Sequence, residues 1–293
     1  MKWRNRKKSS NVDDRRSSSS GGGRGMPSLQ TIMFIMPFLK PLLKSKFGWA
    51  VIGIGAFAYM SGFNPLSLIG VGSSNPTVKD QAADDEKANF ISTVLADTEA
   101  IWGKVFADAG YKYQEPKLVL YRGETRTGCG QANSQVGPFY CPADQTIYLD
   151  LGFYDELALK YGASGDFAQA YILAHEVGHH VQNLQGTLQK VENAKQRVAG
   201  KSDANALQVK VELQADCYAG IWTHHAHKKY NMLEQGDIDE AFNAASSIGD
   251  DRLQKQAQGY VQPDTFTHGS SKQRMTWFHR GLKSGALREC QTF

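Results

Sequence analysis

The sequence predicts an α+β domain with a small antiparallel or mixed sheet and a mainly helical body, preceded by one transmembrane helix. Three observations predict this class. A charge-free apolar stretch lies near the N-terminus, two strand patterns follow at 116–123 and 146–151, and helical periodicity dominates the remainder. The 293 residues, 41% of them hydrophobic, are enough for one sizeable domain with appendages.

Residues 1–46 form a basic segment that we expect to be a disordered cytoplasmic tail. They carry eleven Lys and Arg against two acidic residues, a net charge of +9, and they are rich in Ser and Gly. The remaining 247 residues carry a net charge of −5. A nucleic-acid-binding protein needs a basic face on its folded domain. The charge distribution therefore argues against a nucleic-acid partner.

Residues 47–72 are predicted to be a membrane anchor. No charged side chain occurs in 47–78, and a span of about 20 apolar residues fits within it. Three lysines lie in 40–46 and the next base is Lys79, so the positive-inside rule places the N-terminus in the cytoplasm and the domain outside. The alternatives are a cleavable signal peptide, with its cleavage site at 56–58, and a buried core helix.

A polar linker, residues 73–85, is expected to lead into the folded domain, residues 86–293. The spacing of apolar residues predicts a helix within 87–110. The stretch PKLVLYRG (116–123) predicts a buried strand, and the alternation in TIYLDL (146–151) predicts a half-buried one. Further helices are predicted at about 165–185, 187–199, 204–229 and 237–257.

The four cysteines suit two disulfides in an exported domain. Cys129 and Cys141 bracket a hairpin-like segment, which favours a bond between them and, by elimination, one between Cys217 and Cys290. The alternative is four buried thiols. No pair has the close spacing of a structural zinc site.

The sequence HEVGHH at residues 175–180 predicts a metal site. Residues four apart on a helix project from the same face, so His175 and His179 can hold one ion, whereas His180 points elsewhere. Glu176 lies one step round the helix from His175. There it can border an open coordination position, take a proton from a zinc-activated water and pass it to a leaving amine. This is the HExxH arrangement of zinc peptidases. The alternative is an amphipathic helix with surface histidines.

A catalytic zinc needs a third protein ligand. Glu212 and Asp216 lie four apart in VELQADCYAG (211–220), on another predicted helix. We expect Glu212 to be the third ligand and Asp216 to accept a hydrogen bond from a ligand histidine. Solvated carboxylates on a helix surface are the alternative.

The segment PDTFTHGSSKQR (263–274) offers His268 and Arg274. Either side chain can stabilise the oxyanion that forms when water attacks a peptide carbonyl. Alternatively, both residues join the C-terminal segment to the core. His268 is therefore a candidate transition-state stabiliser, and its role stays open.

These residues resemble known peptidases. HEVGHH followed by ELQAD resembles the gluzincin metallopeptidases, which have HExxH and a glutamate third ligand in ExxxD. From its N-terminus to Cys290 the chain resembles the bacterial YpfJ family of neutral zinc metallopeptidases. The matching stretches are MKWRNRKKSSNVDDRR, TRTGCG, GPFYCPAD, DFAQAYILAHEVGHHVQ, VELQADCYAG, IGDDRLQ and DTFTHGSSKQR.

The resemblance implies a zincin-like domain with one Zn²⁺ per chain. It implies a single-pass anchor in the inner (cytoplasmic) membrane, and an edge strand within GPFYCPADQTIYLDL (137–151) that borders the cleft. A peptide substrate can add to such an edge in extended form. THGSSKQR (267–274) resembles the THPxxxxR segment of membrane-associated gluzincins, with Gly269 in place of the proline.

The predicted function is therefore that of a membrane-anchored zinc metalloendopeptidase with an extracytoplasmic catalytic domain. Two other classes compete with it. One is a non-catalytic, zinc-stabilised binding or scaffold module of the cell envelope, and the other is a hydrolase of non-peptide amides. Replacing Glu176 with Gln separates the peptidase from the binding module, because a binding module keeps its function without a general base.

Overall fold

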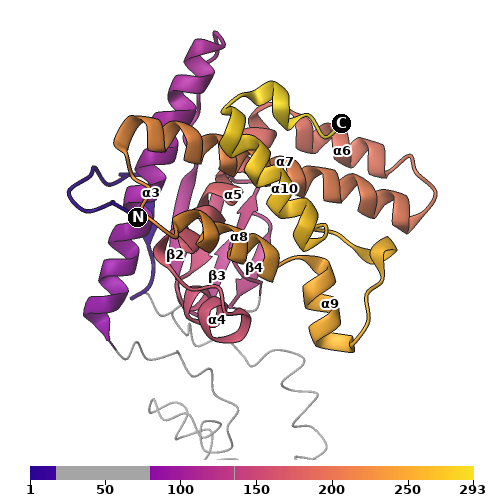
Figure 1. Cartoon of the computed structure of the whole chain (residues 1–293), viewed down its shortest axis with the longest axis horizontal. Helices are drawn as coiled ribbons and strands as arrows, with labels where there is room; N and C mark the ends of the chain where they lie inside the picture. Colours follow the sequence, from indigo (N-terminus) through magenta and orange to yellow (C-terminus); the bar gives the residue numbers. More distant parts are fainter. Residues whose placement is uncertain (18–79, 135) are drawn as a thin grey trace, which may run out of the picture. The chain divides into compact units, whose positions relative to one another are not determined.

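The computed structural model describes residues 1–17, 80–134 and 136–293 (Figure 1). The predicted anchor, residues 47–72, lies outside these residues. In the part of the chain that is described, no helix is both long enough and apolar enough to cross a bilayer. This part is mainly helical, as the sequence predicts, and it has two small sheets where one was expected.

The main sheet has four strands in the order β1-β2-β6-β5. Strand β2 (Lys117–Tyr121) pairs in parallel with β1 (Val12–Asp14) on one side and with β6 (Thr146–Asp150) on the other. Strand β5 (Phe139–Cys141) runs antiparallel to β6. The sheet is therefore mixed, and β5 has one edge without a strand partner among the described residues.

Strand β6 is buried on both faces, so the expectation of a half-buried strand is wrong. Ile147 and Leu149 join the main core beneath the helices. On the other face, Tyr148 stacks on Phe139 with their ring centroids 5.3 Å apart. Ala132 contributes to the same small cluster. It comes from the hairpin of β3 (Glu124–Thr127) and β4 (Gly130–Asn133), so a second layer covers the face that alternation alone leaves to water.

Residues 1–17 are ordered and belong to the domain, so the expectation of a disordered tail is wrong for this part of it. Strand β1 supplies the sheet edge next to β2, and the backbone N–H of Leu118 donates to the Asn11 carbonyl at 2.9 Å. Trp3 packs edge-on against Phe90 of helix α3 (Gln81–Asp108). Residues 18–46 of the predicted tail lie outside the described residues.

Pairing with acidic groups explains how so basic a segment is ordered. The amino group of Met1 donates to Asp166 at 2.7 Å and to Asp237 at 3.3 Å. Arg6 pairs with the buried Asp97. Burial lowers the pKa of the Met1 amino group, but the two carboxylates outweigh burial and raise it. Composition alone does not show these partners, which lie 91 residues or more along the chain.

A helical body packs against the sheet (Figure 1). Its helices are α4 (Gly152–Tyr161), α5 (Asp166–Leu184), α6 (Thr187–Lys195), α7 (Lys201–Tyr230), α8 (Asp237–Ser247), α9 (Asp250–Gln258) and α10 (Ser271–Ser284), with 3-10 turns η2 (Pro263–Thr265) and η3 (Leu287–Cys290). The helix predicted at 237–257 is two helices. The chain is extended at Gly249, where a Cβ atom would lie 2.5 Å from the backbone nitrogen of Ser271.

Helices α7 and α10 cross at two glycines. A Cβ atom on Gly281 would collide with the carbonyl oxygen of Cys217, and one on Gly220 would collide with the carbonyl oxygen of Phe278. Both collisions involve backbone, which cannot move aside as a flexible side chain can. These glycines therefore set the distance between the two helices.

We expect Gly281→Ala to lower the free energy of unfolding by about 1–3 kcal/mol or more, because the helices must separate. Gly103→Ala is the matched control, since a Cβ atom at this position within α3 meets nothing within 4 Å. That change should stabilise the protein by about 0.5–1 kcal/mol. Denaturant unfolding measures both. An equal gain from the two variants would contradict the close crossing.

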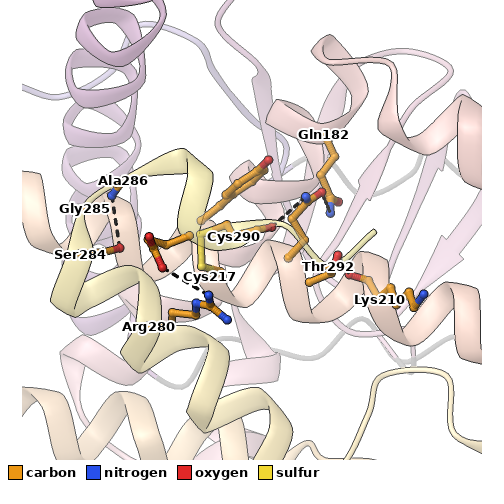
Figure 2. Close-up of a disulfide and its surroundings, with 12 residues drawn as sticks. Gln182, Lys210, Cys217, Arg280, Ser284, Gly285, Ala286, Cys290 and Thr292 are labelled. Carbon is orange, nitrogen blue, oxygen red and sulfur yellow. Dashed lines mark hydrogen bonds and ion pairs between the residues drawn. A yellow bond between two sulfur atoms is a disulfide. The ribbon is translucent and has the colours of Figure 1, made fainter.

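The structure contains the two disulfides that the sequence predicts, Cys129–Cys141 and Cys217–Cys290. The segment between Cys129 and Cys141 is not a hairpin, because its strands belong to different sheets. The second disulfide fastens η3 to α7, and Thr292 donates to the Lys210 carbonyl at 2.8 Å (Figure 2). The C-terminal segment is thereby tied to α7.

Candidate metal centre

Helices α5 and α7 bring the three predicted ligands together. The Nε2 atom of His175 lies 3.2 Å from Oε2 of Glu212, and the Nε2 atom of His179 lies 3.5 Å from the same oxygen. One ligand atom from each residue falls within 4.8 Å of the others. His175 and Glu212 are buried, and His179 is partly exposed.

These separations fit a zinc ion. Zn–N and Zn–O bonds of about 2.1 Å at tetrahedral angles place neighbouring ligand atoms about 3.4 Å apart. The two nitrogen–oxygen distances, 3.2 and 3.5 Å, lie on either side of that value. Two imidazoles and one carboxylate are also the donor set of catalytic zinc sites with a glutamate ligand.

Hydrogen bonds fix the tautomer of both imidazoles. The Nδ1–H of His175 donates to Asp216 at 2.8 Å, and the Nδ1–H of His179 donates to Oε1 of Gln182 at 2.9 Å. Each bond occupies Nδ1, so Nε2 is the ring atom that faces Glu212 and that a metal can take in place of a proton. Glu212 is held in turn, because Gln208 donates to its other oxygen at 2.7 Å.

The electrostatics of this cluster favour a cation at its centre. Burial alone lowers the pKa of His175, but Asp216 and Glu212 outweigh it and raise the pKa to about 9. Burial alone raises the pKa of Glu212, and the two histidines outweigh it and hold that pKa well below its usual range. The carboxylate therefore stays ionised, and the two imidazoles compensate its charge.

Small residues let the ligand helices approach each other. A Cβ atom on Gly178 would lie 2.9 Å from the carbonyl oxygen of Ala215. A side chain at this position would therefore push the two helices apart. The close approach brings α7 near enough for Glu212 to reach both imidazoles. Gly220, on the same helix, serves the crossing with α10 instead.

Glu176 lies beside the ligands and is not one of them. It is 7% exposed and accepts no hydrogen bond from the described residues. Burial raises the pKa of its carboxyl group. A carboxylate without a hydrogen-bonding partner, at the wall of a cavity, is free to exchange a proton with a bound molecule.

Asp216 is the centre of a buried network. It accepts hydrogen bonds from His175, from the Tyr171 hydroxyl at 2.5 Å, and from two nitrogens of Arg274, both at 2.9 Å. Burial alone raises the pKa of Asp216, but Arg274 and His175 outweigh it and lower the pKa to about 2. Asp216 therefore stays ionised and orients His175.

Arg274 joins α10 to this network, which favours the structural alternative over oxyanion stabilisation. The side chain is almost fully buried, and its donors go to Asp216, Tyr171 and the Ile248 carbonyl. A guanidinium committed to protein acceptors has little capacity left for a substrate oxygen. Arg274 acts on the site through Asp216 and also lies close to His175, with its Nη2 3.3 Å from Nδ1 of that ring.

His268 lies at the cavity wall with about half of its side chain exposed. Asp250 organises this turn, because it accepts hydrogen bonds from the backbone nitrogens of Thr267, His268 and Gly269. It also bonds to Nδ1 of His268 at 3.2 Å, and this hydrogen bond raises the pKa of the imidazole. The turn thus presents the imidazole ring to the cavity and favours its protonated form.

The ligands open into a cavity of about 650 Å³. One wall is β5 with the residues before it, and the others come from α5, α6, α7 and the turn at His268. His180 anchors β5, since it accepts from the Tyr140 hydroxyl at 3.0 Å and donates to the Gln114 carbonyl at 2.6 Å. It points away from the ligands, as helical geometry predicts, and fixes the edge strand beside them.

Sequence reasoning missed four polar residues of this site. They are Tyr171, Gln182, Gln208 and Gln214. A signal was present for three of them, because Tyr171 precedes His175, and Gln208 precedes Glu212, by four positions, and Gln182 follows His179 by three. Residues at these spacings share a helix face with the ligand. Gln214 carries no such signal.

Comparison with known proteins is consistent with this geometry. The family model described as "Putative neutral zinc metallopeptidase" matches residues 1–293. The chain belongs to this family. "Uncharacterized protein YpfJ" of Escherichia coli strain K12 is 48% identical over 100% of this chain and 99% of its own length.

A second relative comes from Mycobacterium tuberculosis strain H37Rv and is also described as uncharacterized. It is 42% identical over 205 residues, which cover 67% of each chain. No solved structure matches the chain. Membership of the family supports a zinc peptidase at the level of the family, and the roles of single residues rest on the geometry above.

Proposed function

We propose that the chain is a zinc-dependent endopeptidase of the gluzincin type, with one zinc ion held by His175, His179 and Glu212. The observation that carries this proposal is the convergence of their three ligand atoms beside the buried, unpartnered carboxylate of Glu176. A structural zinc has four protein ligands, whereas a catalytic one keeps a position open. Three ligands at the wall of a cavity fit the second kind.

Glu176 performs the proton transfers in this proposal. Zinc, when bound, supplies a Lewis acid that polarises the scissile carbonyl and lowers the pKa of water. The carboxylate of Glu176 takes a proton from the attacking water and delivers it to the nitrogen of the leaving amine. Burial raises its pKa toward neutrality, which suits a group that must both accept and release a proton.

His268 is proposed to stabilise the negative charge that develops on the carbonyl oxygen. Its ring faces the cavity, and its hydrogen bond to Asp250 favours the imidazolium form. A cationic donor that is already oriented stabilises an oxyanion without reorganising during the reaction.

The substrate is proposed to be a peptide or protein segment in extended form. The cavity wall includes Phe139 and Tyr140 of β5, whose second edge pairs with no described strand. An extended segment can add to that edge through main-chain hydrogen bonds, with its carbonyl group near the zinc ligands. The disulfides suit an oxidising compartment, which supports a domain outside the cytoplasm.

Metal removal tests the proposal. The full chain is incubated with an unfolded protein, and the cleavage products are identified by mass spectrometry. We expect cleavage at internal peptide bonds that stops when a strong chelator removes zinc and returns when zinc is added back. Cleavage that continues in the metal-free protein would contradict the proposal, as would hydrolysis confined to small non-peptide amides.

A further inference from the structure

We propose that Gln182 and Gln214 are positioning residues that connect the ligand His179 to the C-terminal disulfide, so that the disulfide supports zinc affinity. This inference rests on the proposed zinc site. The two ligand histidines are held differently. The carboxylate of Asp216 can only accept the proton of His175, whereas His179 faces the amide of Gln182, which can donate or accept depending on its orientation.

The orientation of Gln182 decides whether His179 can bind a metal. With the amide oxygen toward Nδ1, the imidazole carries its proton on Nδ1 and leaves the Nε2 lone pair free. With the amide turned by about 180°, its NH₂ group faces Nδ1, and a neutral ring must carry its proton on Nε2. That second arrangement blocks the ligand atom.

Backbone carbonyls fix this amide. The Nε2 group of Gln182 donates to the Val211 carbonyl at 2.8 Å and to Oε1 of Gln214 at 3.0 Å. The Nε2 group of Gln214 donates to the Cys290 carbonyl at 3.0 Å. A carbonyl oxygen only accepts, so Val211 and Cys290 leave one self-consistent orientation for each amide. Reversing either amide would place two acceptors against each other.

The disulfide holds the far end of this chain of hydrogen bonds. Cys290 is fully buried and bonded to Cys217 of α7, and Gln182 is among the surrounding residues drawn in Figure 2. Gln182 is fully buried and Gln214 nearly so, so water does not substitute for a lost partner. If the Cys290 carbonyl moves away, the orientation of Gln214 is released, and part of the restraint on Gln182 is lost with it.

The test is the zinc dissociation constant of the full chain, measured by competition with a chromophoric chelator. We expect about 10- to 100-fold weaker binding in Gln182→Leu, because a hydrogen-bonding support of a ligand histidine is lost. Gln214→Leu and Cys290→Ser should weaken binding in the same direction by smaller factors. Gln185→Leu is the matched control. It removes a hydrogen bond with the Tyr218 hydroxyl at the end of α5, outside this chain.

The control separates positioning from general stability. Weaker zinc binding in the first three variants, with wild-type affinity in Gln185→Leu, would support the inference. Equal zinc affinity in the wild type, Gln182→Leu and Gln214→Leu would overturn it. So would an equal loss of affinity in Gln185→Leu. A wild-type chain that binds no zinc would instead overturn the proposed function, and this inference with it.

A second inference concerns the membrane. We infer that residues 1–17 and 80–293 lie on the same side of the membrane that the apolar stretch 47–72 is expected to enter. Strand β1 pairs with β2 in one sheet. Arg16 bonds to Asp84 at 2.7 Å and to Asp85 at 2.9 Å, so the chain leaves and re-enters the domain at one place.

A single crossing is incompatible with this pairing. One span would separate the segment before it from the domain after it by about 30 Å of hydrocarbon. The sequence-based expectation of a cytoplasmic N-terminus with an outside domain therefore conflicts with the sheet.

Cysteine labelling of the full chain tests this inference. Ser10→Cys and Ser202→Cys place single thiols at exposed positions, one in each part. Both are treated in spheroplasts with a membrane-impermeant maleimide, before and after permeabilisation. We expect the two positions to be labelled under the same conditions, in a chain that alkaline carbonate does not release from the membrane. Labelling of one position alone in intact spheroplasts, or release by carbonate, would overturn the inference.

Discussion

Replacing Glu176 with Gln is expected to lower the turnover of peptide hydrolysis by about 10²- to 10⁴-fold while the protein keeps its zinc. The amide has nearly the shape of the carboxylate but does not act as a base at neutral pH. Zinc should remain bound because the three convergent ligand atoms belong to other residues. Steady-state kinetics and elemental analysis of the same preparation measure the two effects.

Glu192→Gln is the matched control for this prediction. Glu192 is another carboxylate that lines the cavity, but it comes from α6 and lies outside the ligand cluster. Its replacement should change turnover by less than about tenfold, as expected for a group that acts in no proton transfer. Turnover that survives in Glu176→Gln, or zinc lost from it, would contradict the role given to Glu176.

Replacing Arg274 with Met is expected to lower the free energy of unfolding by about 3–5 kcal/mol, because it leaves the ionised Asp216 buried without its cationic partner. Both side chains are almost fully buried, so water does not compensate for the loss. Denaturant unfolding measures the effect. The free energy of unfolding of Arg274→Lys should lie between those of the wild type and Arg274→Met, because lysine keeps the charge but loses the paired donors.

A second arginine of α10 provides the control. Arg280 pairs with Glu289 at 3.2 Å, and both side chains are substantially exposed. Its replacement by Met should change stability by only about 0–1 kcal/mol, as for other surface ion pairs. Equal effects at Arg274 and Arg280 would show that the network around Asp216 does not depend on the guanidinium.

The sequence predicts the candidate site well where the site depends on helical periodicity. His175 and His179 are four apart on one helix, and Glu212 and Asp216 are four apart on another, so each pair shares a face before any tertiary structure is known. The close approach of Gly178 to the Ala215 carbonyl is a tertiary contact that the structure adds to this periodicity.

The errors concern contacts between residues that are distant in the sequence. The basic charge of residues 1–17, taken alone, predicts disorder. In the structure Asp97, Asp166 and Asp237 form ion pairs with this segment and order it. The alternation in 146–151 predicts one solvated face, which the β3–β4 hairpin covers. Periodicity continues across Gly249, where the packing of α10 makes the chain turn.

The support of His179 shows the same limit. Gln182 has a local signal in its spacing, but the orientation of its amide depends on Cys290, 108 residues further along the chain. A disulfide predicted from the sequence therefore locates the point at which the C-terminal segment is attached. It does not predict which side chains the disulfide helps to orient.

The central claim is tested most directly by the zinc content of the full-length chain, measured by elemental analysis with Glu212→Gln beside it. The full chain is used because β1, near the N-terminus, belongs to the main sheet. The proposed site predicts one zinc per wild-type chain and a much lower content in the variant. A folded wild type that is free of zinc and cannot be loaded would contradict it, as would an equal zinc content in Glu212→Gln.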